Sequence, residues 1–123
     1  MRALIVDDSR FIRDYLASLL EEQGIECTGT INGQEGLDCM RRSGPYDLAL
    51  VDWNMPIMGG LDFVRAVRAD HGYDTMKIVM VTTEADNQFL EAALDAGANE
   101  YLMKPFDEMG LMDKLEMIGA IGD

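Results

Sequence analysis

Five short apolar runs alternate with five stretches of helical periodicity along this chain, and this alternation constrains the fold more than any other feature. The apolar runs lie at residues 2–6, 25–30, 47–51, 77–82 and 100–103. Helical spacing follows them from residue 11 up to Gly24, and then at residues 33–43, 60–70, 85–96 and 107–119. Strands that alternate with helices form a parallel sheet with helices on both faces. Right-handed crossovers then favour a doubly wound α/β fold, in one domain over residues 1–123.

Composition and charge exclude several classes of function. With 123 residues and 48% hydrophobic content, the chain is long enough for one domain with its own core. A net charge of −13 argues against direct binding to nucleic acid or to an anionic membrane surface. Cys27 and Cys39 form no CxxC pair, which predicts free thiols in a reducing compartment. The opening MRALIVDD lacks the features of a signal peptide and no apolar run reaches the length of a membrane span, so we expect a cytoplasmic protein.

Polar side chains stand at the carboxyl ends of four predicted strands. These residues are Asp7 and Asp8 after the first strand, Asp52 after the third, Thr82 at the end of the fourth and Lys104 after the fifth. Ligands of doubly wound sheets bind at such ends, so we expect the five side chains at one rim. Three carboxylates this close repel one another unless a cation intervenes, and Mg²⁺ suits an all-oxygen site. Zinc is disfavoured because no histidine or cysteine stands near these positions in the sequence.

Each of these residues has a simpler interpretation when it is taken alone. An aspartate pair after a strand often only caps the next helix, a threonine there is usually structural, and a lysine before proline usually lies on the surface. Asp52 is harder to explain in this way, because burying a carboxylate after an apolar strand is unfavourable without a compensating charge. The joint occurrence at separate strand ends favours a functional site.

Four stretches of the sequence resemble the receiver domain of bacterial response regulators. They are VDD at 6–8, DWNMPIMGG at 52–60, TTEA at 82–85 and KPF at 104–106, and the resemblance covers the whole chain in order. The Asp-Trp-Asn-Met-Pro stretch is similar to that of the single-domain chemotaxis regulators of the CheY type. The resemblance implies a flavodoxin-like sheet of five parallel strands in the order 2-1-3-4-5, with five helices.

The resemblance also implies roles for individual residues at the rim. Asp52 would accept a phosphoryl group from the phosphohistidine of a histidine kinase or from a small phosphodonor. Asp8 and Asp52 would bind Mg²⁺ directly, Asp7 largely through water, and Asn54 through its backbone carbonyl. Lys104, aimed inward by a cis peptide bond to the following proline, would pair with a phosphoryl oxygen.

Further positions are implied to act in switching. The Thr82 hydroxyl would bond a second phosphoryl oxygen, and Tyr101 resembles the aromatic residue that follows this threonine in the family. Asn54 and Glu84 match the positions that tune self-dephosphorylation, whereas Thr83 departs from the small alanine common in the group. The fourth helix, fifth strand and fifth helix would form the surface that changes and binds a downstream protein, with the flagellar motor switch implied by the chemotaxis resemblance.

Two sets of apolar residues near these positions have open interpretations. Trp53 is either an ordinary aromatic at the rim or a border of the site, and both interpretations give the same placement. In the last helix, Leu111, Leu115 and Ile118 are predicted to be core residues. The methionines of that helix are either core residues or an adaptable surface for a partner.

Competing functions fail on particular residues. A haloacid-dehalogenase-type phosphatase needs a second aspartate where Asn54 stands, so we expect no enzyme beyond self-phosphorylation and self-dephosphorylation. The chain has no P-loop sequence, and Pro56 and Ile57 replace residues that a calcium EF-hand requires. A flavin module would place a phosphate against Asp7 and Asp8. The chain ends soon after its last predicted helix, so we expect a free-standing regulator. A phosphorelay intermediate, a receiver excised from a longer regulator and an unphosphorylated interaction module stay open as alternatives.

Overall fold

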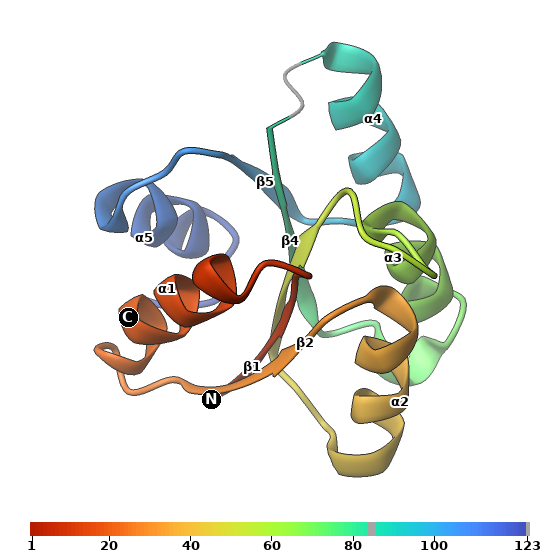
Figure 1. Cartoon of the computed structure of the whole chain (residues 1–123), viewed down its shortest axis with the longest axis horizontal. Helices are drawn as coiled ribbons and strands as arrows, with labels where there is room; N and C mark the ends of the chain where they lie inside the picture. Colours follow the sequence, from red (N-terminus) through yellow and green to blue (C-terminus); the bar gives the residue numbers. More distant parts are fainter. Residues whose placement is uncertain (84–85, 123) are drawn as a thin grey trace.

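Five parallel strands form the central sheet of the protein (Figure 1). They are β1 (Arg2–Val6), β2 (Glu26–Thr30), β3 (Leu48–Asp52), β4 (Lys77–Thr82) and β5 (Glu100–Met103). The computed structural model, which describes residues 1–83 and 86–122, orders them β2-β1-β3-β4-β5. The predicted doubly wound fold and its strand order are therefore confirmed. Because β3 lies between β1 and β4, the carboxylate at its end has a strand end on each side.

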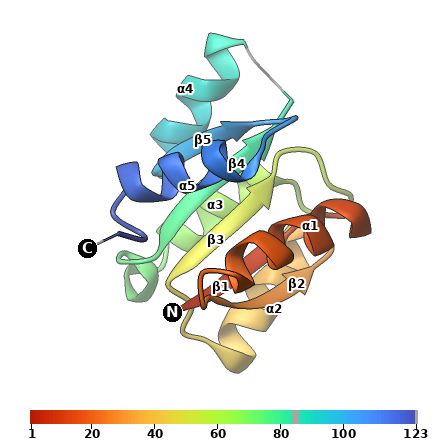
Figure 2. The ribbon, with the colours of Figure 1, turned by 90° about the vertical axis from the view of Figure 1, so that its left-hand side faces the viewer.

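Helices cover both faces of this sheet. On one face lie α1 (Arg10–Glu21) and α5 (Glu108–Met117), and on the other lie α2 (Gly33–Ser43), α3 (Gly60–Arg68) and α4 (Asn87–Ala96) (Figures 1 and 2). Each face of the sheet carries its own cluster of buried apolar side chains. The central strands are apolar on both faces for this reason. None of the described helices combines the length and apolar character that a bilayer span requires.

Side chains at four helix starts fix where the helices begin. Ser9, Asn32, Asp86 and Asp107 each accept a hydrogen bond from a backbone N–H in the first turn of the helix that follows. These bonds satisfy donors that have no partner within the helix. Because each of these helices starts soon after a strand ends, the loops between them gather at the carboxyl edge of the sheet.

The helix boundaries differ from the sequence-based prediction in several places. A 3₁₀ helix at His71–Tyr73, η1, was not predicted because three residues carry too little periodicity, and α3 ends at Arg68 instead of residue 70. The last helix ends at Met117 instead of residue 119, since Gly119 adopts a left-handed φ of 76°. The predicted start of the fourth helix at residue 85 lies outside the described residues.

The last helix contributes to the core much as expected. Leu111 and Leu115 are buried, and Ile118 at its C-cap is half-buried against the same cluster. Two methionines of the helix are instead largely exposed, with exposed fractions of 72% for Met109 and 66% for Met117. The open interpretation of these methionines is therefore resolved toward the surface at two positions.

Candidate phosphoacceptor site

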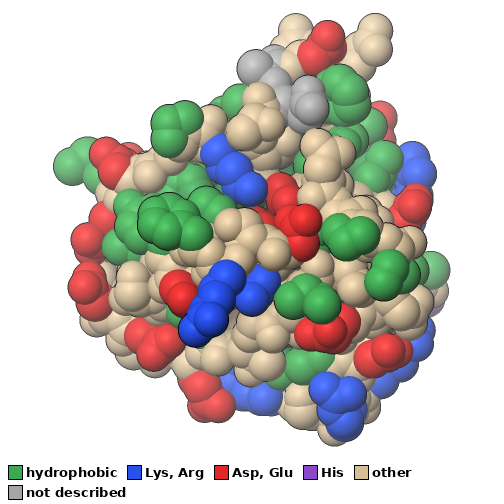
Figure 3. Space-filling model, viewed as in Figure 1, with side chains coloured by type: hydrophobic (Ala, Val, Ile, Leu, Met, Phe, Trp, Pro, Cys, Tyr) green, Lys and Arg blue, Asp and Glu red, His purple; other side chains and the backbone are tan. Residues whose placement is uncertain are grey.

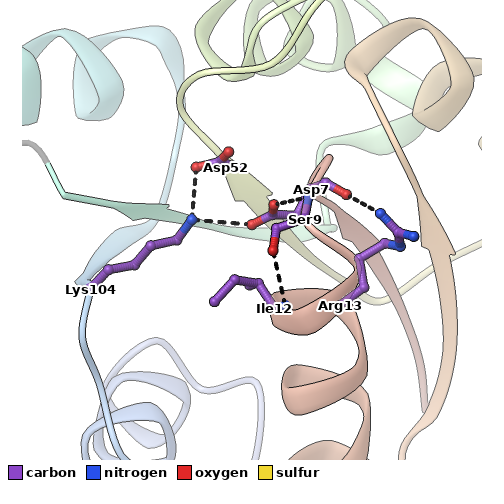
Figure 4. Close-up of polar contacts among 6 residues, drawn as sticks. All are labelled: Asp7, Ser9, Ile12, Arg13, Asp52 and Lys104. Carbon is purple, nitrogen blue, oxygen red and sulfur yellow. Dashed lines mark hydrogen bonds and ion pairs between the residues drawn. The ribbon is translucent and has the colours of Figure 1, made fainter.

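Three charged side chains from separate strand ends meet at the carboxyl edge of the sheet (Figure 4). The Lys104 Nζ donates to Oδ1 of Asp52 at 3.1 Å and to Oδ2 of Asp7 at 3.3 Å. The exposed fractions are 19% for the lysine side chain, 2% for Asp7 and 12% for Asp52. Two largely buried carboxylates therefore share one ammonium group, which compensates part of their charge.

Backbone contacts hold Asp7 in place. Its Oδ1 accepts a hydrogen bond from the Ser9 N–H at 2.8 Å, and its carbonyl accepts one from the Arg13 guanidinium at 2.9 Å. The cap of α1 is Ser9, whose hydroxyl oxygen accepts from the Ile12 N–H. The simpler interpretation of the aspartate pair, a helix cap, is therefore wrong.

The three acids of the rim have the arrangement that a cation needs. Asp7, Asp8 and Asp52 each offer a carboxylate oxygen, and these oxygens lie within 4.8 Å of one another. Their exposure is graded: Asp7 is buried, Asp52 is half-buried and Asp8 is exposed. One lysine cannot balance three carboxylates, so the rim retains negative charge. An oxygen-only donor set that is open to solvent on one side fits Mg²⁺ with some of its waters retained.

Burial and neighbouring charges set the protonation states of Asp52 and Lys104. Burial raises the pKa of Asp52, and the Asp7 carboxylate raises it further, while the hydrogen bond and charge of Lys104 act in the opposite direction. Burial alone lowers the pKa of Lys104, but the contacts with Asp52 and Asp7 outweigh this effect and the net direction is upward. Lys104 is therefore firmly cationic, and a charged Asp52 is held at an energetic cost.

The loop after Asp52 closes tightly onto the strand end. A Cβ on Gly60 would collide with the backbone carbonyl oxygen of Asp52, and the Gly60 N–H donates to the Trp53 carbonyl at 3.0 Å. Only glycine allows this approach at the start of α3. Asn54 lies in the same loop with its side chain exposed.

The remaining predicted residues lie around this centre. Thr82 is 2% exposed at the end of β4, and its carbonyl accepts the Lys104 backbone N–H at 2.8 Å. Tyr101 pairs in register with Met80, whereas Thr82 pairs with Met103, so Tyr101 lies two residues before the rim. The cis peptide bond predicted between Lys104 and its proline is present. Glu84 lies outside the described residues.

Two contacts near the site were not predicted from the sequence. The Trp53 ring meets the Phe89 ring of α4 edge-on, with centroids 5.3 Å apart and an interplanar angle of 85°. The Arg13 guanidinium reaches the Asp7 carbonyl from the first turns of α1. For Arg13, the spacing from Ser9 on one helix face is a weak signal that could have been used. For Phe89, nothing in its own segment points to a partner 36 positions earlier.

The surface view places this centre on an open face of the molecule. Figure 3 shows acidic side chains near the middle of the face, with basic and hydrophobic side chains on either side. One apolar hollow beside Lys104 is lined by Phe11, Ile12, Tyr15 and Phe106. Of the three carboxylates, the exposed Asp8 and the half-buried Asp52 can be reached from solvent.

Comparison with known proteins gives a consistent result. The family model described as response regulator receiver domain matches residues 3–116. A chemotaxis protein CheY of Pseudomonas aeruginosa is 40% identical over 120 residues, which cover 96% of this chain and 95% of that protein. The chemotaxis protein CheY1 of Helicobacter pylori strain J99 is 38% identical over 127 residues, with 100% of each chain covered. The solved structure of the chemotaxis response regulator CheY4 of Vibrio cholerae matches with a TM-score of 0.89 at 33% identity, over 95% of this chain and 97% of that one.

Proposed function

The chain belongs to the response regulator receiver domain family, and from this premise we propose that it is a chemotaxis-type signalling switch whose phosphoacceptor is Asp52. The observation that supports this most is the shared lysine: Lys104 lies 3.1 Å from Asp52 and 3.3 Å from Asp7. A lysine in this position can form an ion pair with a phosphoryl group bound to Asp52. Phosphoryl transfer depends mainly on positioning and on neutralising charge, which this arrangement provides.

The chemistry of the transfer is carried by the carboxylate. An Asp52 oxygen attacks the phosphorus of a histidine kinase's phosphohistidine, or of a small donor such as acetyl phosphate. The bond from phosphorus to the donor nitrogen or oxygen breaks, and its electron pair leaves with the donor. Asp52 then carries an acyl phosphate, which water later hydrolyses to release inorganic phosphate. Lys104 pairs with an oxygen of the bound phosphoryl group.

Asp7, Asp8 and Asp52 form the cation site. Asp8 and Asp52 would hold Mg²⁺ directly, Asp7 would hold it largely through water, and Asn54 would contribute its backbone carbonyl. The ion would supply charge neutralisation for the phosphoryl oxygens. Asp7 also keeps Lys104 oriented, because its Oδ2 accepts a hydrogen bond from the lysine.

The output of the switch is a change of surface. The Thr82 hydroxyl bonds a phosphoryl oxygen, Tyr101 follows, and the surface formed by α4, β5 and α5 changes its affinity for a downstream protein. The resemblance to chemotaxis regulators implies the flagellar motor switch as that target, and two relatives of this chain are named as chemotaxis proteins. Asn54 and Glu84 tune the lifetime of the acyl phosphate. We also infer that the domain spans residues 1–123 and works in the cytoplasm, where free thiols such as Cys27 and Cys39 persist.

The fluorescence of Trp53, the only tryptophan, tests this proposal. Its backbone adjoins Asp52 and its ring packs on α4, so both cation binding and phosphorylation should alter its emission. We expect a change on adding Mg²⁺ and a further change on adding acetyl phosphate. The second change should vanish in Asp52→Ala and persist in Asp62→Ala, a matched control with an exposed acid on α3. A full response in Asp52→Ala would contradict the assignment.

A further inference from the structure

The three acids of the rim are not held in place equally. The Asp52 carboxylate accepts a hydrogen bond from Lys104. The Asp7 carboxylate accepts one from Lys104 and one from the Ser9 N–H. The Asp8 side chain is exposed, and it makes no hydrogen bond or ion pair within the part of the chain that the structure describes. Its position therefore depends on the backbone that carries it.

The peptide group between Asp7 and Asp8 is held by Arg13 of α1 (Figure 4). The Nη1 of Arg13 donates to the Asp7 carbonyl oxygen at 2.9 Å. This carbonyl belongs to the same rigid plane as the Asp8 N–H, so the bond limits the rotation of that plane and fixes the place of the Asp8 Cα. On the other side of the residue, the Asp7 N–H donates to the Thr30 carbonyl at 3.0 Å. The backbone is thus held on both sides of Asp7, directly before Asp8.

The half-buried side chain of Arg13 reaches this carbonyl by passing close to β2. A Cβ on Gly29 would lie 3.3 Å from Cδ of Arg13, which is tighter than an ordinary van der Waals contact, and 3.7 Å from its Nε. Glycine at this position therefore leaves room for the arginine stem. The backbone N–H of Arg13 donates to the Ser9 carbonyl at 3.0 Å in the first turn of α1. Arg13 thus connects α1 and β2 to the end of β1, where the aspartate pair begins.

The positive charge of Arg13 acts against a cation site, whereas its hydrogen bond supports one. Within the described residues the Arg13 guanidinium forms no ion pair, unlike that of Arg10, whose Nε lies 3.6 Å from Oδ2 of Asp14. A cation beside the acidic rim repels Mg²⁺, so the charge alone lowers the affinity for the ion. A bond that holds a ligand in place raises that affinity. The two effects have opposite signs, and removal of the arginine shows which one dominates.

We propose that Arg13 is a positioning residue of the cation site: it holds the Asp7–Asp8 peptide group and thereby places the Asp8 carboxylate for direct contact with Mg²⁺. The inference rests on the proposed function, in which Asp8 is a ligand of the ion. A ligand that is ordered only when the ion arrives costs conformational entropy at that moment, and a fixed backbone reduces this cost. Loss of a group that orients a metal ligand typically lowers the affinity by about tenfold or more.

The test compares the Mg²⁺ affinity of the full chain with that of Arg13→Met, which removes the guanidinium and keeps an unbranched stem. MgCl₂ is titrated into the metal-free protein at constant ionic strength, and the dissociation constant is read from the fluorescence of Trp53, on the Asp52 side of the site. We expect Arg13→Met to bind Mg²⁺ about tenfold more weakly. An affinity that is unchanged, or higher because a repelling charge is gone, would overturn the proposal.

Two further variants separate position from charge. Arg10→Met removes the same charge from the first turn of α1, where the side chain is 87% exposed and pairs only with Asp14, so the affinity should stay within about twofold of the wild type. Arg13→Lys keeps the charge with a shorter reach, and its affinity should lie between those of the wild type and Arg13→Met. Far-UV circular dichroism shows that each variant is folded. Equal weakening in Arg10→Met and Arg13→Met would contradict a role specific to Arg13.

A second measurement follows the backbone itself. In ¹⁵N relaxation of the metal-free chain, the order parameter of the Asp8 N–H should fall below the rigid value of about 0.85 in Arg13→Met, and that of Asp52 should not. Weaker Mg²⁺ binding without this change would contradict the route through the peptide group.

The same titrations distinguish this inference from the proposed function. A wild-type chain that binds Mg²⁺ no better than Arg13→Met contradicts the inference alone. A wild-type chain with no Mg²⁺ response contradicts the cation site of the proposed function and, with it, the role of Arg13 in that site.

Discussion

Two basic side chains occupy opposite ends of the sheet, and the atoms around them differ in kind. At the carboxyl end, Lys104 contacts the carboxylates of Asp7 and Asp52. At the amino end of β4 and β5, the Arg68 guanidinium donates to oxygens that carry no formal charge. One cation therefore sits among surplus negative charge, and the other sits among neutral acceptors.

The Arg68 guanidinium donates four hydrogen bonds. Its Nε and terminal nitrogens donate to the carbonyls of Gly97, Tyr73 and Met76 at 2.9, 2.8 and 2.7 Å, and to Oδ1 of Asn99 at 3.0 Å. The same Asn99 oxygen accepts the Ile78 N–H at 2.7 Å. These bonds join the end of α3 to η1, to the start of β4 and to the turn before β5.

The contacts at the amino end of the sheet stabilise the fold, whereas those at the carboxyl end form the functional site. The Arg68 contacts satisfy backbone carbonyls, and the nearby Asp74 carboxylate favours the charged guanidinium, so these contacts serve to fix the fold. The Lys104 contacts leave three carboxylates with one cation, which is unfavourable until a metal ion or a phosphoryl group changes the balance.

Replacing Arg68 should cause the largest loss of stability. Arg68→Met removes four hydrogen bonds from a charged donor and leaves partly buried acceptors without it, so we expect a loss of about 3 kcal/mol in the free energy of unfolding. Urea unfolding followed by circular dichroism measures it. The control is Arg65→Met on the same helix, where the guanidinium only lies 3.7 Å from the exposed Asp62 and the expected loss is under about 0.5 kcal/mol. Similar losses in the two variants would refute a structural role specific to Arg68.

Mg²⁺ should stabilise the carboxyl end. At about ten times its dissociation constant, a ligand that binds only the folded state raises the free energy of unfolding by about 1.4 kcal/mol. The gain should shrink strongly in Asp52→Asn, which lacks one of the three carboxylates, and persist in Arg68→Met. Sodium chloride at equal ionic strength is the control for general screening. A gain that NaCl reproduces would show that no specific cation site exists.

Removing the Asp52 charge should stabilise the protein when Mg²⁺ is absent. Asp52→Asn avoids the cost of burying a charge and relieves the repulsion from Asp7 and Asp8, which together are worth on the order of 1 kcal/mol. Because the folded pKa of Asp52 is raised, its destabilising effect develops as the pH rises through that pKa. The advantage of Asp52→Asn should therefore be largest at neutral pH and disappear as the wild-type carboxyl is protonated. A loss of stability at pH 7, or a gain that grows toward acid, would contradict this account.

The smallest effect concerns a thiol in a third environment, at the far edge strand β2. Burial, with a smaller contribution from the Glu21 carboxylate, raises the pKa of Cys27 from 9.0 to about 11. At pH 8 the thiolate is rare, so Cys27 should react with a disulfide reagent at least about tenfold more slowly in the folded chain than in urea. Cys39→Ser isolates its signal. A rate equal to that of the unfolded chain would show that the thiol is not shielded.

The carboxyl end was largely predictable from the sequence, because strand periodicity places Asp7, Asp52 and Lys104 at one edge. An apolar strand followed by a carboxylate is a strong local signal, and parallel topology brings the two carboxylates Asp7 and Asp52 to the same edge as Lys104. The sequence did not predict the close approach of Gly60 to the Asp52 carbonyl, the protonation states of Asp52 and Lys104, or the edge-on contact between Trp53 and Phe89, since all of these depend on packing between elements.

The hydrogen bonds of Arg68 at the amino end of the sheet were not predicted from the sequence. Arg68 ends an ordinary amphipathic helix, and its partners are mainly backbone carbonyls, which every residue possesses and no sequence pattern marks. The one side-chain partner, Asn99, lies 31 positions away in a turn. The Glu100–Lys114 pair was missed for the same reason, since a strand residue and a helix residue meet only after folding.

The most direct test of the central claim is to identify the residue that receives the phosphoryl group. The chain is incubated with acetyl phosphate and Mg²⁺, the acyl phosphate is reduced with borohydride to convert the modified aspartate to homoserine, and the peptides are sequenced by mass spectrometry. We predict homoserine at position 52, and none after omission of Mg²⁺ or of the donor. Homoserine at Asp7 or Asp8, or at no position while the fold is intact, would contradict the assignment of Asp52 as the phosphoacceptor.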